Sequence, residues 1–293
     1  MIKNVTIGSD AEVIVQDLSN RPFPICGMVG GTKDKPRKIP DTPYFIQEDN
    51  VLLEFNIPPC TTQAEFKKHM TQALNSALTQ LPPSLKLYKA STAIYDRNLI
   101  AFGQAYMFGC DPDFNAWTME ENPKPTAANK ELRSAAGHIH IGWDNPTNED
   151  RIALIKACDI FAGLRSVIQF TDRTRRELYG KAGSFRPKEY GVEHRVLDNE
   201  WVFNGYANVI YDWYHEAINF VNAGLVSQIT KEDEELIQKS INTYDYRNCE
   251  KLVNKYGKLL YGKDYVPNLD TGNDILNTLY YHSFTKGNKK KVG

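Results

Sequence analysis

Apolar and polar residues alternate in short runs through the first half of the chain, and helical spacing dominates the last third. Alternation with a period of two is typical of a strand with one buried face, whereas apolar residues three and four positions apart indicate an amphipathic helix. The first pattern predicts strands at 4–7, 11–15, 50–57, 84–94, 101–108, 136–142 and 191–197. The second predicts helices near 62–80, 148–170, 200–223, 231–242 and 246–256.

This order of elements favours an α+β fold with a largely antiparallel sheet backed by helices. The segment 21–43, RPFPICGMVGGTKDKPRKIPDTP, is rich in proline and glycine and predicts a long functional loop. The sequence contains no GxGxxG or GxxxxGKS motif, which disfavours a Rossmann or P-loop nucleotide site. With 293 residues, 41% of them hydrophobic, we expect one catalytic domain over residues 1–285 and a basic disordered tail at 286–293.

The overall composition narrows the class of partner and compartment. Thirty-five basic and 36 acidic residues give a formal net charge of -1, so we expect neither a nucleic acid nor a membrane surface as partner. The five cysteines are scattered without a CxxC pair, which indicates free thiols in a reducing compartment. No apolar stretch approaches the about 18 residues of a spanning helix, and the start MIKNVTIGSDAEV has no signal-like apolar core. A cytoplasmic location is expected.

Four of the predicted strands carry polar side chains two positions apart. Each pair would lie on one face of its strand while the neighbouring positions, mostly apolar, lie on the other. The pairs are Asp10 and Glu12, Glu54 and Asn56, His138 and His140, and Glu193 and Arg195. Any one of them is ordinary on a solvated strand face, but four at the same spacing indicate a shared site.

The chemistry of these pairs points to a divalent cation. Carboxylates that lie close together repel and raise one another's pKa, so a charged cluster needs a cation. Mostly oxygen ligands with a single imidazole suit Mg²⁺ or Mn²⁺, whereas two or three histidines with one carboxylate would suit Zn²⁺.

A basic segment leads directly into the last of these strands. Residues 171–195, TDRTRRELYGKAGSFRPKEYGVEHR, contain Arg173, Arg175, Arg176, Lys181, Arg186, Lys188 and Arg195. Guanidinium groups hold phosphate oxygens in pairs, and glycines allow backbone N–H groups to approach them. The glutamates interspersed among these residues favour one phosphate site over an extended nucleic-acid surface.

The sequence resembles the carboxylate–amine ligases of the glutamine synthetase and glutamate–cysteine ligase superfamily, in particular the phage-type amidoligases (COOH.NH2 ligase type 2). The similarity runs from Gly8 to Trp201, through GSDAEV, DNVLLEFNIPP, GHIHIG and YGKAGSFRPKEYGVEHR. It implies a catalytic domain like that of glutamine synthetase, and host cytoplasm as the location if the gene is phage-borne.

The resemblance also implies roles for individual residues. The expected metal ligands are Asp10, Glu12, Glu54, His138 and Glu193. Arg186 and Arg195 would bind the phosphates of ATP and, with Glu193, form the catalytic group. His140 would line the nucleotide or substrate pocket, and we expect Arg176 and Lys181 of the basic segment to join the cofactor-binding residues.

The expected function is therefore ATP-dependent amide formation through an acyl phosphate, with Mg²⁺ or Mn²⁺. The substrates would be small-molecule or peptide carboxylates and amines, such as a cell-wall peptide or a protein terminus. Asp111 and Asp113 are candidates for a general base. Two alternatives are a zinc hydrolase that uses His138 and His140 as ligands and a non-catalytic phosphate- or nucleic-acid-binding protein. The oligomeric state, homo-oligomer or monomer, is left open.

Overall fold

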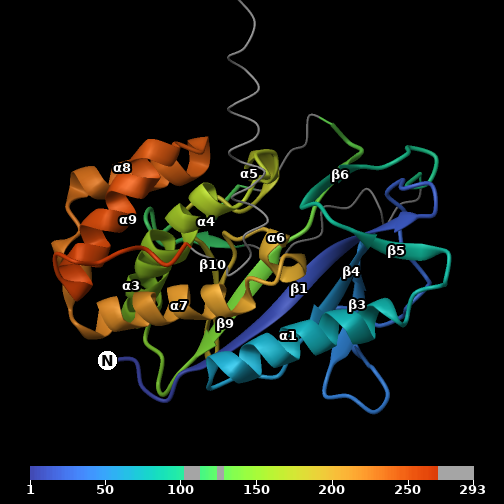
Figure 1. The fold of residues 1–293 in the computed structure, drawn as a ribbon, viewed down its shortest axis with the longest axis horizontal. Coiled ribbons are helices and arrows are strands. Elements are labelled where there is room, and N and C mark those ends of the chain that lie inside the picture. Colours follow the sequence, from blue (N-terminus) through green and yellow to red (C-terminus); the bar gives the residue numbers. More distant parts are fainter. Residues whose placement is uncertain (102–112, 124–128, 270–293) are drawn as a thin grey trace, which may run out of the picture.

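The computed structural model describes residues 1–101, 113–123 and 129–269, and it is an α+β fold with a mostly antiparallel sheet (Figure 1). The main sheet has the strand order β2-β3-β4-β1-β9-β11-β10-β7, and β5 also pairs with β1. Its strands are β1 (Thr6–Asp17), β2 (Arg37–Lys38), β3 (Phe45–Asp49), β4 (Leu52–Asn56), β5 (Leu85–Tyr88), β7 (Phe114–Asn115), β9 (Gly137–Gly142), β10 (Ser184–Lys188) and β11 (Gly191–His194). A separate two-stranded sheet joins β6 (Thr92–Ile94) to β8 (Leu132–Ser134).

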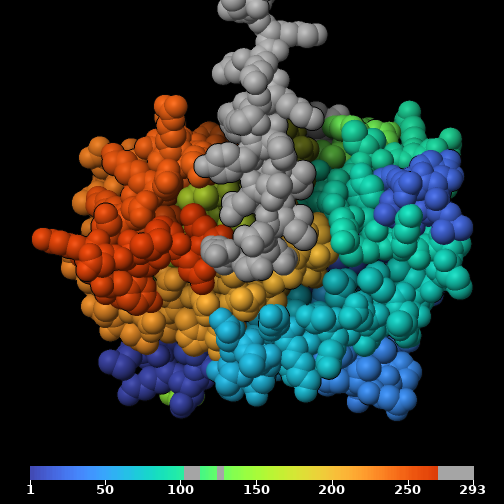
Figure 2. All heavy atoms as spheres, in the orientation of Figure 1, coloured from blue at the N-terminus to red at the C-terminus, as the bar shows by residue number. Residues whose placement is uncertain are grey.

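The helices are α1 (Gln63–Leu78), α3 (Asn148–Cys158), α4 (Leu164–Gln169), α5 (Arg175–Leu178), α6 (Glu200–Phe203), α7 (Ala207–Asn222), α8 (Lys231–Thr243) and α9 (Tyr246–Tyr261). One face of the main sheet is covered by helices: α1 packs against β1 and β4, α3 against β11 and α6 against β9, and α8 and α9 pack against α4. A π-helical turn, η1 (Asp159–Gly163), links α3 to α4, and a 3₁₀ turn, η2 (Leu225–Gln228), follows α7. Figure 2 shows α7 to α9, orange to red, on one side of the helical face and α1, cyan, on the other.

The apolar face of the sheet and the helices share one core. Ala11 of β1, Phe55 of β4 and Ile139 of β9 are fully buried in the same cluster as the helical residues Phe66 and Trp201. Because side chains alternate along a strand, burying this face turns the opposite set of side chains away from the helices. In the part of the chain that the structure describes, none of the helices is long and apolar enough to cross a membrane.

The predicted elements and the observed ones differ mainly where strands are short or interrupted. The predicted strands 4–7 and 11–15 are one strand, β1, and the predicted strand 84–94 is two strands in different sheets. The strands missed from the sequence are β2, β3, β7, β8 and β10, of two to five residues each. Runs this short carry too little periodicity to be recognised, and the proline in β10 also argues against a strand.

The helices begin close to their expected positions but are more interrupted than expected. Thr62 caps α1 and forms a capping box with Glu65, which fixes its start. The predicted helix 148–170 contains the π turn η1, and the predicted helix 200–223 is divided into α6 and α7. The predicted strand 101–108, Asp111 and the basic tail at 286–293 lie outside the described residues.

The proline- and glycine-rich segment 21–43 is mostly loop, as expected, and contains only the short β2. Backbone N–H groups of Gly27, Val29 and Gly30 donate to the Glu48 carboxylate at 2.6, 2.9 and 2.8 Å. Gly27 and Gly30 adopt positive φ, which lets successive N–H groups converge on one anion. The loop therefore fixes the end of β3, where Asp49 follows Glu48.

Candidate active site

The register of the sheet places the four polar pairs on one face. Asp10 of β1 lies opposite Asn56 of β4 and opposite His138 of β9. Glu12 lies opposite Glu54 on β4. Since directly opposed residues point to the same side of a sheet, these side chains form a continuous surface on the side away from the helices, which we call the polar face.

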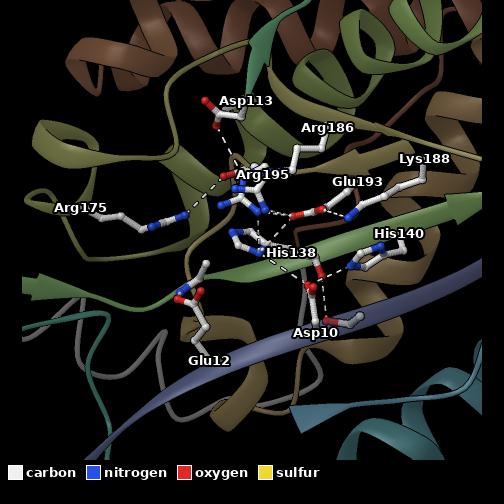
Figure 3. Close-up of polar contacts among 12 residues, drawn as sticks. Asp10, Glu12, Asp113, His138, His140, Arg175, Arg186, Lys188, Glu193 and Arg195 are labelled. Atoms are coloured by element: carbon white, nitrogen blue, oxygen red, sulfur yellow. Dashed lines mark hydrogen bonds and ion pairs between the residues drawn. The ribbon is translucent and has the colours of Figure 1, made fainter. Parts of the chain in front are cut away.

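The polar face continues onto β11 and β10. His140 lies opposite Glu193, and Glu193 lies opposite Arg186. Strand β9 and the β10–β11 hairpin, about 45 residues farther along the chain, therefore bring an imidazole, a carboxylate and a guanidinium side by side (Figure 3).

Glu193 is the charged centre of this face and is 1% exposed. Arg195 donates to its Oε1, Lys188 Nζ lies 2.8 Å from its Oε2, and Arg186 lies 3.6 Å from its Oε1 (Figure 3). Burial and the repulsion of Asp10 raise the pKa of Glu193, but Arg195 and the two histidines outweigh them and lower it to about 2. Glu193 is therefore ionised at neutral pH.

Asp10, His140 and Glu193 form the first group of candidate metal ligands. Each offers one ligand atom, and these atoms lie within 4.8 Å of one another. His140 Nε2 lies 2.9 Å from Asp10 Oδ1, and its Nδ1 lies 2.5 Å from the Tyr190 hydroxyl. Burial raises the pKa of Asp10, but its attraction to His140 and hydrogen bonds from both histidines hold the pKa well below its ordinary value.

His138 lies beside the same two carboxylates. Its Nδ1 lies 3.5 Å from both Asp10 and Glu193 and 3.3 Å from Arg195. Burial and the Arg195 charge lower the pKa of His138 to about 3, so its imidazole is neutral. His140 thus joins the candidate ligand group, and the role of His138 as a metal ligand stays a prediction.

A second acidic group lies farther along β1. Glu12, Asp49 and Glu54 offer oxygens within 4.8 Å of one another, and Glu12 and Glu54 are 8% and 7% exposed. Burial and the Asp49 charge raise the pKa of Glu12 to about 8, and burial with the neighbouring acids raises that of Glu54 well above its ordinary value. The group is poorly compensated by protein charges, which fits a divalent cation among the three carboxylates.

Asp49 was missed in the sequence because it ends a strand that the pattern did not reveal. In β3, Gln47 and Asp49 lie two positions apart and share one face of the strand, and Gln47 lies opposite Glu54. The only available signal was this i, i+2 polar spacing next to the Glu54 strand.

An arginine-lined pocket opens beside the second acidic group. Its lining contains three guanidinium groups, three acids and a histidine: Arg133, Arg175, Arg195, Glu12, Asp49, Asp113 and His138. We call it the arginine pocket. Asp113, a candidate general base from the sequence, lies 3.5 Å from Arg195 Nε. Arg133 lies on β8 and was not named from the sequence, whereas Arg175 begins α5 and belongs to the basic segment that predicts a phosphate site.

Of the expected cofactor-binding residues, Arg195 lines this pocket, and Arg176, Lys181, Arg186 and His140 do not. Arg186 and His140 lie on the polar face beside Glu193. Arg176 is 6% exposed and donates to the Gly180 carbonyl at 3.1 Å and the Ser166 hydroxyl at 2.7 Å. Its guanidinium also stacks over Tyr244. Lys181 is exposed in the turn before β10. In this structure Arg176 is held by these internal contacts, and its expected role in cofactor binding stays a prediction.

A buried polar network supports the strand that carries Glu193 and Arg195. Asp159 accepts hydrogen bonds from Trp117 Nε1 and the Gly183 backbone N–H, both at 2.6 Å, and its other oxygen lies 3.1 Å from His194 Nε2. His194 Nδ1 lies 2.6 Å from the Tyr214 hydroxyl. Three donors satisfy the buried carboxylate, and they fix β11 relative to the loop before β10.

The raised pKa of Glu12 predicts a pH-dependent stability in metal-free protein. Folding raises this pKa from 4.5 to about 8. The contribution of protonated Glu12 to the free energy of unfolding is therefore fully present below pH 4.5 and is lost as the pH rises toward 8. Glu12→Gln removes the titrating group, and its free energy of unfolding relative to the natural protein should rise across this window by up to about 1.4 kcal/mol per pH unit.

The measurement is urea unfolding of both proteins with chelator at pH 5 and pH 8. Other histidines and acids change the free energy of unfolding equally in both proteins, so their effect cancels when the two are compared at the same pH. An equal difference at both pH values would show that Glu12 is ionised in the metal-free fold.

No protein-family model and no curated protein matches the chain. Among solved structures, it is similar to a bifunctional glutathione synthetase from Pasteurella multocida, with a TM-score of 0.40 and 10% sequence identity. The similarity covers 90% of this chain and 53% of that protein, so the chain spans about half of its length. A similarity at this level does not define a family, and the functional argument depends on the site.

Proposed function

We propose that the protein is an ATP-dependent carboxylate–amine ligase that uses Mg²⁺ or Mn²⁺. The observation that carries the proposal is the polar face itself: two groups of metal-ligand residues lie beside a pocket with three arginines. Acids alone would repel a triphosphate, and arginines alone would not need the acids. A metal–nucleotide complex would use both, because the carboxylates would hold the metal ion and the arginines the phosphates.

The proposed reaction has two steps. A carboxylate oxygen of the acid substrate attacks the γ-phosphorus of ATP, the bond from that phosphorus to the bridging oxygen breaks, and ADP leaves with the electron pair. The amine nitrogen then attacks the carbonyl carbon of the acyl phosphate. The carbon–oxygen bond breaks, phosphate leaves with the electron pair, and a proton of the amine passes to solvent.

The residues of the polar face have distinct roles in this reaction. Asp10, His140 and Glu193 would hold one metal ion, and Glu12, Asp49 and Glu54 a second. When bound, the metal neutralises phosphate charge during transfer. Arg195 and Arg186 orient the phosphates, and the buried Glu193 keeps both guanidinium groups in place.

This proposal retains the relationship suggested by the sequence motifs. The protein would be a phage-type amidoligase with a catalytic domain like that of glutamine synthetase, and its substrates would be small-molecule or peptide acids and amines in the cytoplasm. Within the described residues, each candidate metal group contains one histidine or none. This disfavours the zinc hydrolase, which requires His138 and His140 as joint ligands.

The first test is thermal stability in the presence of ATP and Mg²⁺. We expect ATP to stabilise the fold only together with Mg²⁺ or Mn²⁺, because the acids of the polar face repel the bare triphosphate. At a hundredfold excess over Kd the stabilisation is about 2.7 kcal/mol, which for a chain of this size raises Tm by several degrees.

Controls are ATP with chelator, and Mg²⁺ without nucleotide. An equal rise in Tm from ATP with chelator would contradict the metal-bridged site. Stoichiometric Zn²⁺ that survives purification and supports hydrolysis without ATP would favour the hydrolase. ADP release, screened over amino acids and peptidoglycan-derived peptides, then identifies the substrate pair.

A further inference from the structure

A second pocket of about 370 Å³ opens on the polar face at the other end of β1. Its lining includes Gly8, Asp10, Asn56, His140, Gly142 and Tyr190, together with Thr6, Ser9, Ile57 and Pro59. The volume falls within the range of about 300 to 1,000 Å³ that is usual for small-molecule sites. We call it the glycine pocket, and the metal-ligand residues Asp10 and His140 separate it from the arginine pocket.

Two glycines line the pocket at neighbouring positions of β1 and β9. Gly8 lies opposite His140, and Gly142 lies opposite Thr6, so both glycines lie on the same face as the acids. A Cβ on Gly142 would come within 2.7 Å of Thr6 Oγ1, so this position has no room for a larger residue. Glycine inside a strand weakens the strand and often marks a place where a ligand approaches the backbone.

The two pockets differ in charge. Three arginines line the arginine pocket, whereas no lysine or arginine is found among the described residues that line the glycine pocket. The glycine pocket instead presents hydrogen-bond acceptors. Asn56 Oδ1 is buried and accepts no hydrogen bond within the described chain, and the Asp10 carboxylate borders the same space.

Tyr190 forms one side of the glycine pocket. The residue is 48% exposed, and its hydroxyl lies 2.5 Å from His140 Nδ1. The ring therefore narrows the pocket beside the first group of candidate metal ligands, and the pocket leads from solvent to that group.

We propose that the glycine pocket binds the amine substrate. This inference rests on the proposed ligase function and adds the location and chemistry of the second substrate. An amine nitrogen presents N–H donors and, as ammonium, a positive charge, which Asn56 and Asp10 can accept. A phosphate or a free carboxylate finds its cationic partners in the arginine pocket instead, so the two substrates approach the reacting atoms from opposite ends of β1.

Gly8→Val tests the proposal by filling the pocket from its floor. A Cβ on Gly8 meets Ile57 O and Pro59 Cα at 3.9 Å, which is ordinary contact, and valine suits a strand. The probes are glycinamide, which has an amine and no carboxylate, and N-acetylglycine, which has the reverse. Binding is followed by saturation-transfer NMR on the full chain with Mg²⁺ and a non-hydrolysable ATP analogue.

We expect the affinity for glycinamide to fall at least tenfold in Gly8→Val and by less in Gly8→Ala. The affinity for N-acetylglycine should not change in either variant. The reciprocal control is Ser134→Val, which narrows the arginine pocket and should weaken nucleotide binding while glycinamide still binds. Unchanged glycinamide binding in both Gly8 variants, or loss of N-acetylglycine alone, would overturn the assignment.

The ligase function and the amine site can be contradicted by different results. If the natural protein binds glycinamide in a Gly8-dependent way but gains no stability from ATP with Mg²⁺, the ligase function is wrong and the amine site stands. If Gly8→Val does not fold, Gly8→Ala and Asn56→Leu provide the comparison, because Asn56→Leu removes the acceptor and should lower glycinamide affinity in the same assay.

Discussion

Replacing Arg195 by lysine should lower ATP-dependent ADP release by about two to three orders of magnitude, the usual effect of losing a preorganised donor. Arg195 contacts Glu193, His138 and Asp113 at once. Lysine keeps the positive charge but cannot reproduce the planar guanidinium group, so the phosphate would lose its orientation more than its binding. Nucleotide-induced stabilisation should therefore persist while turnover falls.

The matched control is Arg21→Lys, because Arg21 pairs with Asp17 on the surface and is 71% exposed. The same chemical change there should leave turnover unaltered. If Arg195→Lys unfolds the protein, Arg195 has mainly a structural role. If it releases ADP at the natural rate, the phosphate site lies elsewhere.

Replacing Asp49 by asparagine should raise the Mg²⁺ concentration needed for nucleotide binding by at least 10- to 100-fold. That range is typical for loss of a residue that only supports a metal ligand, and Asp49 is proposed to bind the metal directly. Removing one of three clustered carboxylates also relieves repulsion, so the metal-free protein should become more stable, not less. Titration of the ATP-induced rise in Tm with Mg²⁺ measures both effects.

Asp34→Asn provides the control for Asp49→Asn, since Asp34 is exposed in the preceding loop and the substitution removes the same charge. It should leave the Mg²⁺ requirement unchanged. An unaltered requirement in Asp49→Asn would show that the second acidic group holds no catalytic metal, and the site would then depend on Asp10, His140 and Glu193.

The sequence alone determined the α+β fold class and the face on which most of the candidate residues lie. A strand turns every second side chain to the same side, so the spacing of Asp10 and Glu12, or of Glu193 and Arg195, is sufficient to predict a common face once the other face is apolar. The same argument placed the long helices, because their apolar periodicity extends over several turns.

Only the tertiary structure decided which of these residues are neighbours. Strand order and register set Asp10 opposite His138 and His140 opposite Glu193, and so brought both imidazoles next to carboxylates that are far away in the sequence. Both are long-range properties that local periodicity does not encode.

The residues that the sequence missed lie in short elements. Asp49 and Arg133 come from strands of five residues or fewer, and in the four-residue helix α5 Arg175 lines the arginine pocket while Arg176 turns into the core. In such elements the backbone direction depends on packing against the rest of the fold. The sequence therefore determined the chemistry available to the site, and the packing of distant strands determined which atoms share it.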